Sequence, residues 1–146
     1  MTLDNLVGIN LEEIVPDAIM IQRLLAAAKR NINDAQIEQL SNENSFDSAY
    51  KAIMQLANVA LQANGYRTLT SKPGHHQTMI QSLTKTIGLD REVVIVLDAL
   101  RKQRNVADYS GDLVPDANVI ECIDYAKQLL RQVNKWLSDI DPDLNV

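Results

Sequence analysis

Apolar residues recur along most of the chain at alternating steps of three and four, which is the spacing of one face of an α-helix. The first such stripe starts from Ile14, and Pro16 and Asp17 open its helix. This pair suits a helix start, because proline fits the first turn and a carboxylate stabilises the positive end of the helix dipole. The pattern predicts a helix that ends before residues 42–44. Its stripe contains Ala18, Ile21, Leu25, Ala28, Ile32 and Ala35.

A second stripe predicts a helix that begins around Ser45, a residue type that caps helix N-termini well. This helix is expected to end at Asn64 and Gly65, where glycine accepts the left-handed backbone that closes a helix. After a predicted loop, a shorter stripe predicts a third helix that ends at Gly88. The two stripes contain Phe46, Ala49, Ile53, Leu56, Ala60 and Ala63, and then His76, Ile80, Leu83 and Ile87.

The fourth helix is predicted over REVVIVLDALRKQRNVADY, with Asp90 as its N-cap. The run VVIVL is β-branched and would also suit a buried strand. We interpret it as helical because Val93, Leu97 and Leu100 keep helical spacing, and ALRKQR continues with good helix formers.

The fifth predicted helix opens with VPDA at residues 114–117, which repeats residues 15–18 letter for letter. We therefore expect the same helix-start chemistry twice. The stripe of this last helix contains Val119, Ile123, Ala126, Leu130, Val133 and Leu137.

Together these patterns predict an all-α fold without strands, namely an antiparallel up-and-down bundle of four to five helices with their apolar faces turned inward. A chain of 146 residues fits a single domain. We expect its core at about residues 16–137, followed by an acidic flexible tail at 138–146.

Composition indicates the compartment of the protein and the kinds of partner that it can contact. No apolar run approaches the roughly 18 residues that span a bilayer, and the N-terminal residues lack the pattern of a signal peptide. The single Cys122 cannot form an internal disulfide; we expect a thiol buried in the core and a reducing compartment, hence a cytoplasmic protein without membrane association. A net charge of −5 argues against a broad grip on nucleic acid, so any such contact would be local.

The fourth helix changes character near its end. Arg101, Arg104, Asn105 and Asp108 share one stripe, and Arg104 also continues the apolar face of Leu97. A guanidinium is costly to bury without a partner, so Arg104 must either meet a carboxylate or line a wet groove. One interpretation is structural, with Arg104 paired to Asp108 at a solvated helix end. The other is a functional site.

The third helix favours a site. His76 lies on its inward stripe, directly after His75, and Tyr66 and Arg67 precede it in the loop. In an up-and-down bundle, His76 and Tyr66 are expected to face Arg104 and the Tyr109 that follows. We predict no metal and no cofactor, because adjacent histidines on a helix point about 100° apart and no Glu-x-x-His motif accompanies them.

Three short motifs occur in order: ANGYR at 63–67, GHH at 74–76, and R-x-x-R-N-x-x-D-Y at 101–109. With them the chain resembles the HEPN domains (higher eukaryotes and prokaryotes nucleotide-binding), above all a small bacterial branch, over roughly residues 16–137. The resemblance implies a homodimer. Many relatives are metal-independent ribonucleases of toxin–antitoxin and antiphage systems, often encoded beside a nucleotidyltransferase.

In that family an arginine holds phosphate and a histidine a few residues later assists the chemistry. Arg104 and Asn105 match the first two motif positions, whereas Tyr109 stands near the place of the histidine. Tyrosine is a poor base at neutral pH, so we consider His76 as its replacement. The predicted catalytic residues are Arg104, Tyr109 and His76, and the predicted ligand-binding residues are Arg101, Asn105, Asp108, Tyr66, Arg67 and His75.

Two functions stay open. The first is a HEPN-like protein that binds RNA or a nucleotide, with or without ribonuclease activity. The second is a non-catalytic module that pairs with a partner protein such as a nucleotidyltransferase. The missing histidine favours the second function. The polar stripe favours the first, because a purely structural bundle would be more stable with leucine there.

Overall fold

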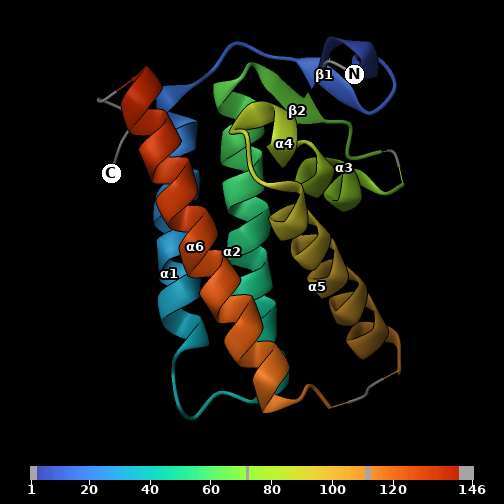
Figure 1. Cartoon of the computed structure of the whole chain (residues 1–146), viewed down its shortest axis with the longest axis vertical. Helices are drawn as coiled ribbons and strands as arrows, with labels where there is room; N and C mark the ends of the chain where they lie inside the picture. Colours follow the sequence, from blue (N-terminus) through green and yellow to red (C-terminus); the bar gives the residue numbers. More distant parts are fainter. Residues whose placement is uncertain (1–2, 72, 111–112, 142–146) are drawn as a thin grey trace.

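The computed structural model describes residues 3–71, 73–110 and 113–141, without the side chains of 107–110. Four long helices alternate in direction along the molecule, so α2 and α6 run parallel to each other (Figure 1). The predicted all-α bundle is confirmed. The long helices are α1 Ala18–Ala35, α2 Asn42–Ala63, α5 Arg91–Ser110 and α6 Asp116–Ile140.

Helix α2 is the centre of the bundle. It packs against α1 and α6 on one side and against α3 and α5 on the other. Most of its side chains are therefore buried, in contrast to the single stripe of α1. Fully buried leucines on α2, α5 and α6, such as Leu56, Leu97 and Leu129, fill the core. Each such burial stabilises the fold by about 1.5–3 kcal/mol.

The two VPDA segments do not start their helices in the same way. Asp17 caps α1, with its carboxylate accepting hydrogen bonds from the backbone N–H groups of Ile19 at 3.0 Å and Met20 at 3.4 Å. In α6 the cap residue is Pro115, and the carboxylate of Asp116 instead accepts from the Asn42 side chain at 2.7 Å. The expectation of a repeated helix start was therefore wrong, because a neighbouring helix engages the second aspartate.

The start of α2 also differs from the prediction. Its N-cap is Ser41, whose hydroxyl accepts from the backbone N–H of Asn44 at 3.2 Å, and Ser45 is buried inside the helix. Asn42 and Asn44 are poor helix formers taken alone. Contacts to the start of α6 favour the extra turn, since Asn42 also donates to the carbonyl of Val114 at 2.9 Å.

The predicted absence of strands was wrong. β1 Leu11–Glu13 pairs antiparallel with β2 Tyr66–Thr68, and Glu12 lies opposite Arg67. Gly65, with φ of +89°, turns the chain from α2 into β2. Strands of three residues are too short to show an alternating pattern, and their pairing joins segments far apart in the sequence. The sheet and the 3₁₀ helix Leu3–Leu6 cover one end of the bundle (Figure 1).

The predicted third helix is two short ones, α3 His75–Gln81 and α4 Leu83–Thr86, interrupted at Ser82. Ile80 and Leu83 are buried as predicted. At the other end, α6 continues to Ile140, so residues 138–140 are helical instead of part of a tail. Residues 142–146 of the predicted tail lie outside the described part.

The side chains of α6 face the core slightly differently from the prediction. Cys122 and Leu129 are fully buried, whereas Ile123 and Leu130 are half-buried. Cys122 is a free thiol in the core, as expected. None of the described helices is both long and apolar enough to cross a membrane.

Candidate functional site

Arg104 of α5 is held by two side chains of α2. Its Nε lies 2.8 Å from Oδ1 of Asp47, and its guanidinium carbon lies 5.2 Å from the centre of the Tyr50 ring. Asp47 and Tyr50 are one helical turn apart, so they engage the same guanidinium, Asp47 by an ion pair and Tyr50 by a cation–π contact. The carboxylate that meets Arg104 thus comes from a neighbouring helix. The side chain of Asp108, the partner considered from the sequence, lies outside the described residues.

Tyr50 also contacts His76 of α3. The tyrosine hydroxyl lies 3.1 Å from Nδ1 of the histidine, and the two ring centres are 6.0 Å apart. The ring of His75 packs edge-on against His76 with 4.5 Å between centres. Arg104 and His76, which the sequence predicted to lie close together, therefore contact the same buried tyrosine.

Arg101 lies one turn before Arg104 on α5. Its Nε is 2.8 Å from Oδ1 of Asp98, and Nζ of Lys102 is 3.6 Å from the other oxygen of the same carboxylate. Asp47, Tyr50, His75, His76, Arg101 and Arg104 together form one polar cluster. It joins α2, α3 and α5 at the side of the bundle away from α1 (Figure 1).

The environment fixes the protonation of two members of this cluster. Burial raises the pKa of Tyr50 to about 12, although Arg104 and Arg101 act in the opposite direction. Burial also lowers the pKa of His76, and His75 and the two arginines lower it further. At neutral pH, Tyr50 therefore keeps its proton and His76 is predominantly neutral.

Two predicted residues lie elsewhere. The hydroxyl of Tyr66 donates to Asp4 near the N-terminus, and Arg67 forms an ion pair with Glu12 across the strand pair. The prediction that Tyr66 faces Arg104 was therefore wrong, because pairing of β2 with β1 directs the ANGYR segment to the sheet. Arg67 belongs to the same sheet.

The remaining predicted residues are on α5. Asn105 is half-buried and follows Arg104 directly. Asp108 and Tyr109 belong to α5, but their side chains lie outside the described residues.

Sequence reasoning missed Asp47 and Tyr50. A signal did exist, since Tyr50 lies beside Ala49 on the apolar stripe of α2, and a tyrosine buried in a helix needs a partner for its hydroxyl. The sequence did not indicate that this partner would be His76.

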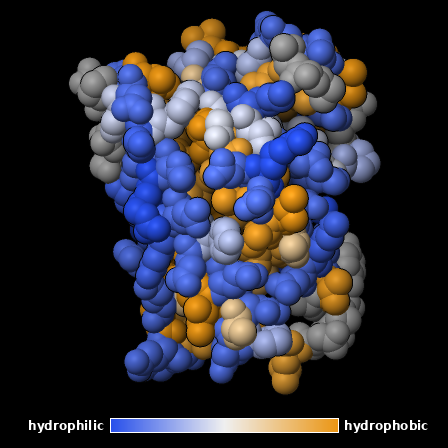
Figure 2. All heavy atoms as spheres, in the orientation of Figure 1, coloured by the Kyte–Doolittle hydropathy of each residue, from blue (hydrophilic) through white to orange (hydrophobic). Residues whose placement is uncertain are grey.

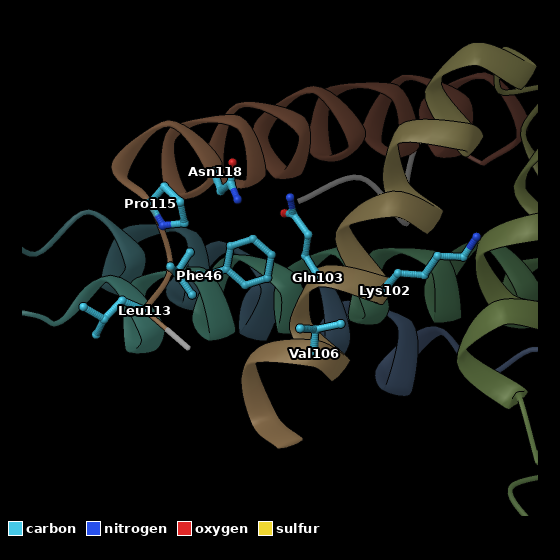
Figure 3. A pocket seen from close by; sticks show the side chains of 8 residues that line it. Phe46, Lys102, Gln103, Val106, Leu113, Pro115 and Asn118 are labelled. Carbon is cyan, nitrogen blue, oxygen red and sulfur yellow. The ribbon is translucent and has the colours of Figure 1, made fainter. Parts of the chain in front are cut away.

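A mainly apolar cavity of about 290 Å³ lies next to the cluster, between the end of α5 and the start of α6 (Figure 3). Val106 and Leu113 at its rim are exposed, by 57% and 86%. Apolar side chains also gather on the face where α2 lies between α6 and α5 (Figure 2). Side chains that line the cavity include Phe46, Gln103, Val106, Leu113, Pro115 and Asn118.

Among the described residues, no group of three histidine, cysteine or acidic side chains is arranged to hold a metal ion. No protein-family model, no curated protein and no solved structure matches this chain. The HEPN resemblance thus rests on its three motifs.

Proposed function

We propose that this chain is a HEPN-like cytoplasmic protein that binds RNA through the phosphate backbone at the cluster of Asp47, Tyr50, His75, His76, Arg101 and Arg104. We name this set the phosphate cluster for that role. The observation that carries the proposal is the fixed orientation of Arg104 between Asp47 and Tyr50, next to His76. Arginine is the side chain best suited to phosphate, because its planar group offers five N–H donors.

The ion pairs that orient Arg101 and Arg104 support binding of RNA. Asp47 and Asp98 each contact an arginine through Nε, which is one of the five N–H donors of a guanidinium. The side chain of Arg104 is 31% exposed, so a ligand can reach it from solvent. An arginine that is already ordered loses less side-chain entropy on binding than a free one.

The negative charge of the chain limits its affinity for RNA. A net charge of −5 repels RNA as a whole, and the two aspartates offset part of the local positive charge. We therefore expect a local contact by Arg101, Lys102 and Arg104. For single-stranded RNA, three neutralised phosphates correspond to a slope of about −2 in a plot of log affinity against log salt. A homodimer, as the resemblance implies, would present two such clusters and a steeper slope.

A binding experiment with a matched control tests this proposal. We would measure the fluorescence anisotropy of labelled single-stranded RNA with wild type, Arg104→Ala and Arg23→Ala, in EDTA, and examine the RNA for cleavage on a gel. Arg23 is exposed on α1, so its replacement changes the net charge equally but away from the cluster.

We expect Arg104→Ala to weaken binding at least tenfold and Arg23→Ala to change it less than about twofold, since hydrogen bonds to charged groups contribute about 1.5–3 kcal/mol. Equal losses in both variants would mean that only net charge matters. Absence of binding by wild type would refute the proposal.

The apolar cavity favours a second candidate function, the non-catalytic module that binds a partner protein. Its exposed rim residues Val106 and Leu113 are suited to contact an apolar side chain of a partner such as a nucleotidyltransferase. In that case Leu113→Asp would abolish binding of a co-purified nucleotidyltransferase and Arg104→Ala would not. The reverse pattern would favour the RNA-binding function.

A further inference from the structure

The hydroxyl of Tyr50 is buried in the middle of the phosphate cluster and has a defined neighbour. Tyr50 is only 2% exposed, and among the described residues its hydrogen-bond partner is Nδ1 of His76, at 3.1 Å. A buried hydroxyl without a partner destabilises a fold, so this contact determines where the phenol proton points.

The direction of the hydrogen bond follows from the chemistry of the two groups. Because burial raises the pKa of Tyr50 to about 12, the phenol keeps its proton at neutral pH and acts as the donor. Nδ1 of His76 then accepts, and the proton of the neutral imidazole is on Nε2. The hydrogen-bond partner thus determines the tautomer. If Nδ1–H of His76 instead donated to the phenol oxygen, the phenol proton of Tyr50 would have no acceptor among the described residues.

The groups around His76 favour its neutral form. Arg101 and Arg104 approach from α5, Tyr50 contacts it from α2, and His75 adjoins it on α3. The two arginines disfavour a third positive charge. His76 is half-buried, and its hydrogen bond to Tyr50 occupies Nδ1, so among the described residues Nε2 is the ring nitrogen left for a ligand.

We infer that Tyr50 is a positioning residue that holds His76 as an Nε2–H donor, so that His76 binds a phosphate oxygen instead of removing a proton from the RNA. A general base needs an unprotonated ring nitrogen, and in this arrangement that nitrogen is Nδ1, which faces Tyr50. The inference rests on the proposed function and specifies it: the site binds the RNA backbone without cleaving it.

The tautomer can be measured without any ligand. We would record histidine ring ¹H–¹⁵N spectra at pH 7.5 of wild type, Tyr50→Phe and a control, Tyr125→Phe. Tyr125 is a partly buried tyrosine of α6. Phenylalanine keeps the ring beside Arg104 and removes only the hydroxyl. We expect wild type and Tyr125→Phe to show His76 protonated on Nε2, and Tyr50→Phe to show a mixture of tautomers. An Nδ1–H signal in wild type would overturn the inference, even if Tyr50→Phe fails to fold.

RNA binding and cleavage supply the functional readout. In the anisotropy assay we expect Tyr50→Phe to weaken RNA binding by about 2–12-fold, the range that one net hydrogen bond supports, and Tyr125→Phe to leave it unchanged. A changed tautomer with unchanged affinity would overturn the positioning role. Cleavage of RNA by wild type that His76→Ala abolishes would overturn the donor role. If wild type binds no RNA, the proposed function fails, whereas the tautomer result still stands by itself.

Discussion

Replacement of Arg104 by methionine distinguishes a binding role of this side chain from a structural one. The ion pair with Asp47 joins side chains that are 31% and 48% exposed, and pairs of this kind contribute about 0.2–1 kcal/mol. The contact of the guanidinium with the Tyr50 ring, at 5.2 Å, adds about 0.5–1 kcal/mol. Methionine has similar length, and its sulfur recovers about 0.3–1.5 kcal/mol against the same ring.

We therefore expect Arg104→Met to change the free energy of unfolding by less than about 2 kcal/mol, which corresponds to a Tm shift within about 8 °C for a chain of this size. Urea unfolding followed by circular dichroism measures this. Leu97→Ala serves as the structural comparison, because loss of a fully buried leucine costs about 2–5 kcal/mol.

The same variant should lose RNA affinity by about 10–100-fold, because a charge-assisted hydrogen bond to phosphate is removed. Leu97→Ala, studied below its Tm, should bind RNA like wild type. If Arg104→Met instead lowered the unfolding free energy by more than about 3 kcal/mol, or bound RNA normally, Arg104 would be a structural residue and our reasoning would be refuted.

Three further predictions concern two features of the fold and the protonation of His76. Asp17→Ala should lower the free energy of unfolding by about 1 kcal/mol in urea, through loss of the α1 cap, and an unchanged value would show that the cap is dispensable. Gly65→Ala should cost about 1–2 kcal/mol in thermal unfolding, because alanine is strained at φ of +89°; a neutral result would mean that this turn relaxes. The lowered pKa of His76 means that the unfolded chain binds more protons between that pKa and 6.5, so the folded state should lose stability as pH falls through this window. His76→Gln should remove this part of the pH dependence. If the free energy of unfolding of wild type and His76→Gln varied with pH in the same way, His76 would not be the group responsible.

The long helices could be predicted because their apolar stripes are continuous over several turns. The Ile21, Leu25, Ala28 stripe of α1, for example, is buried as expected. Features that depend on a distant segment could not be predicted. The first turn of α2 depends on contacts between Asn42 and the start of α6, and β2 exists because β1 pairs with it.

The same distinction applies to the site. Arg104 and His76 were found because each interrupts an apolar stripe with a charged or titratable group. Asp47, which lies 57 positions before Arg104, was not found, because nothing near it in the sequence indicates an ion pair. The position of Tyr66 was predicted wrongly for a related reason. Its neighbours in sequence do not reveal that its hydroxyl donates a hydrogen bond to Asp4.

The most direct test of RNA binding at the phosphate cluster is a titration of ¹⁵N-labelled protein with single-stranded RNA, followed through the backbone amide signals and the side-chain signals of arginine Nε–H and of the histidine rings. We predict that the signals of Arg101, Arg104 and His76 shift together as RNA is added, while that of Arg23 on α1 stays in place. If the changes were confined to residues around the apolar cavity, such as Val106 and Leu113, or if no signal moved, the phosphate cluster would not be the RNA-binding site.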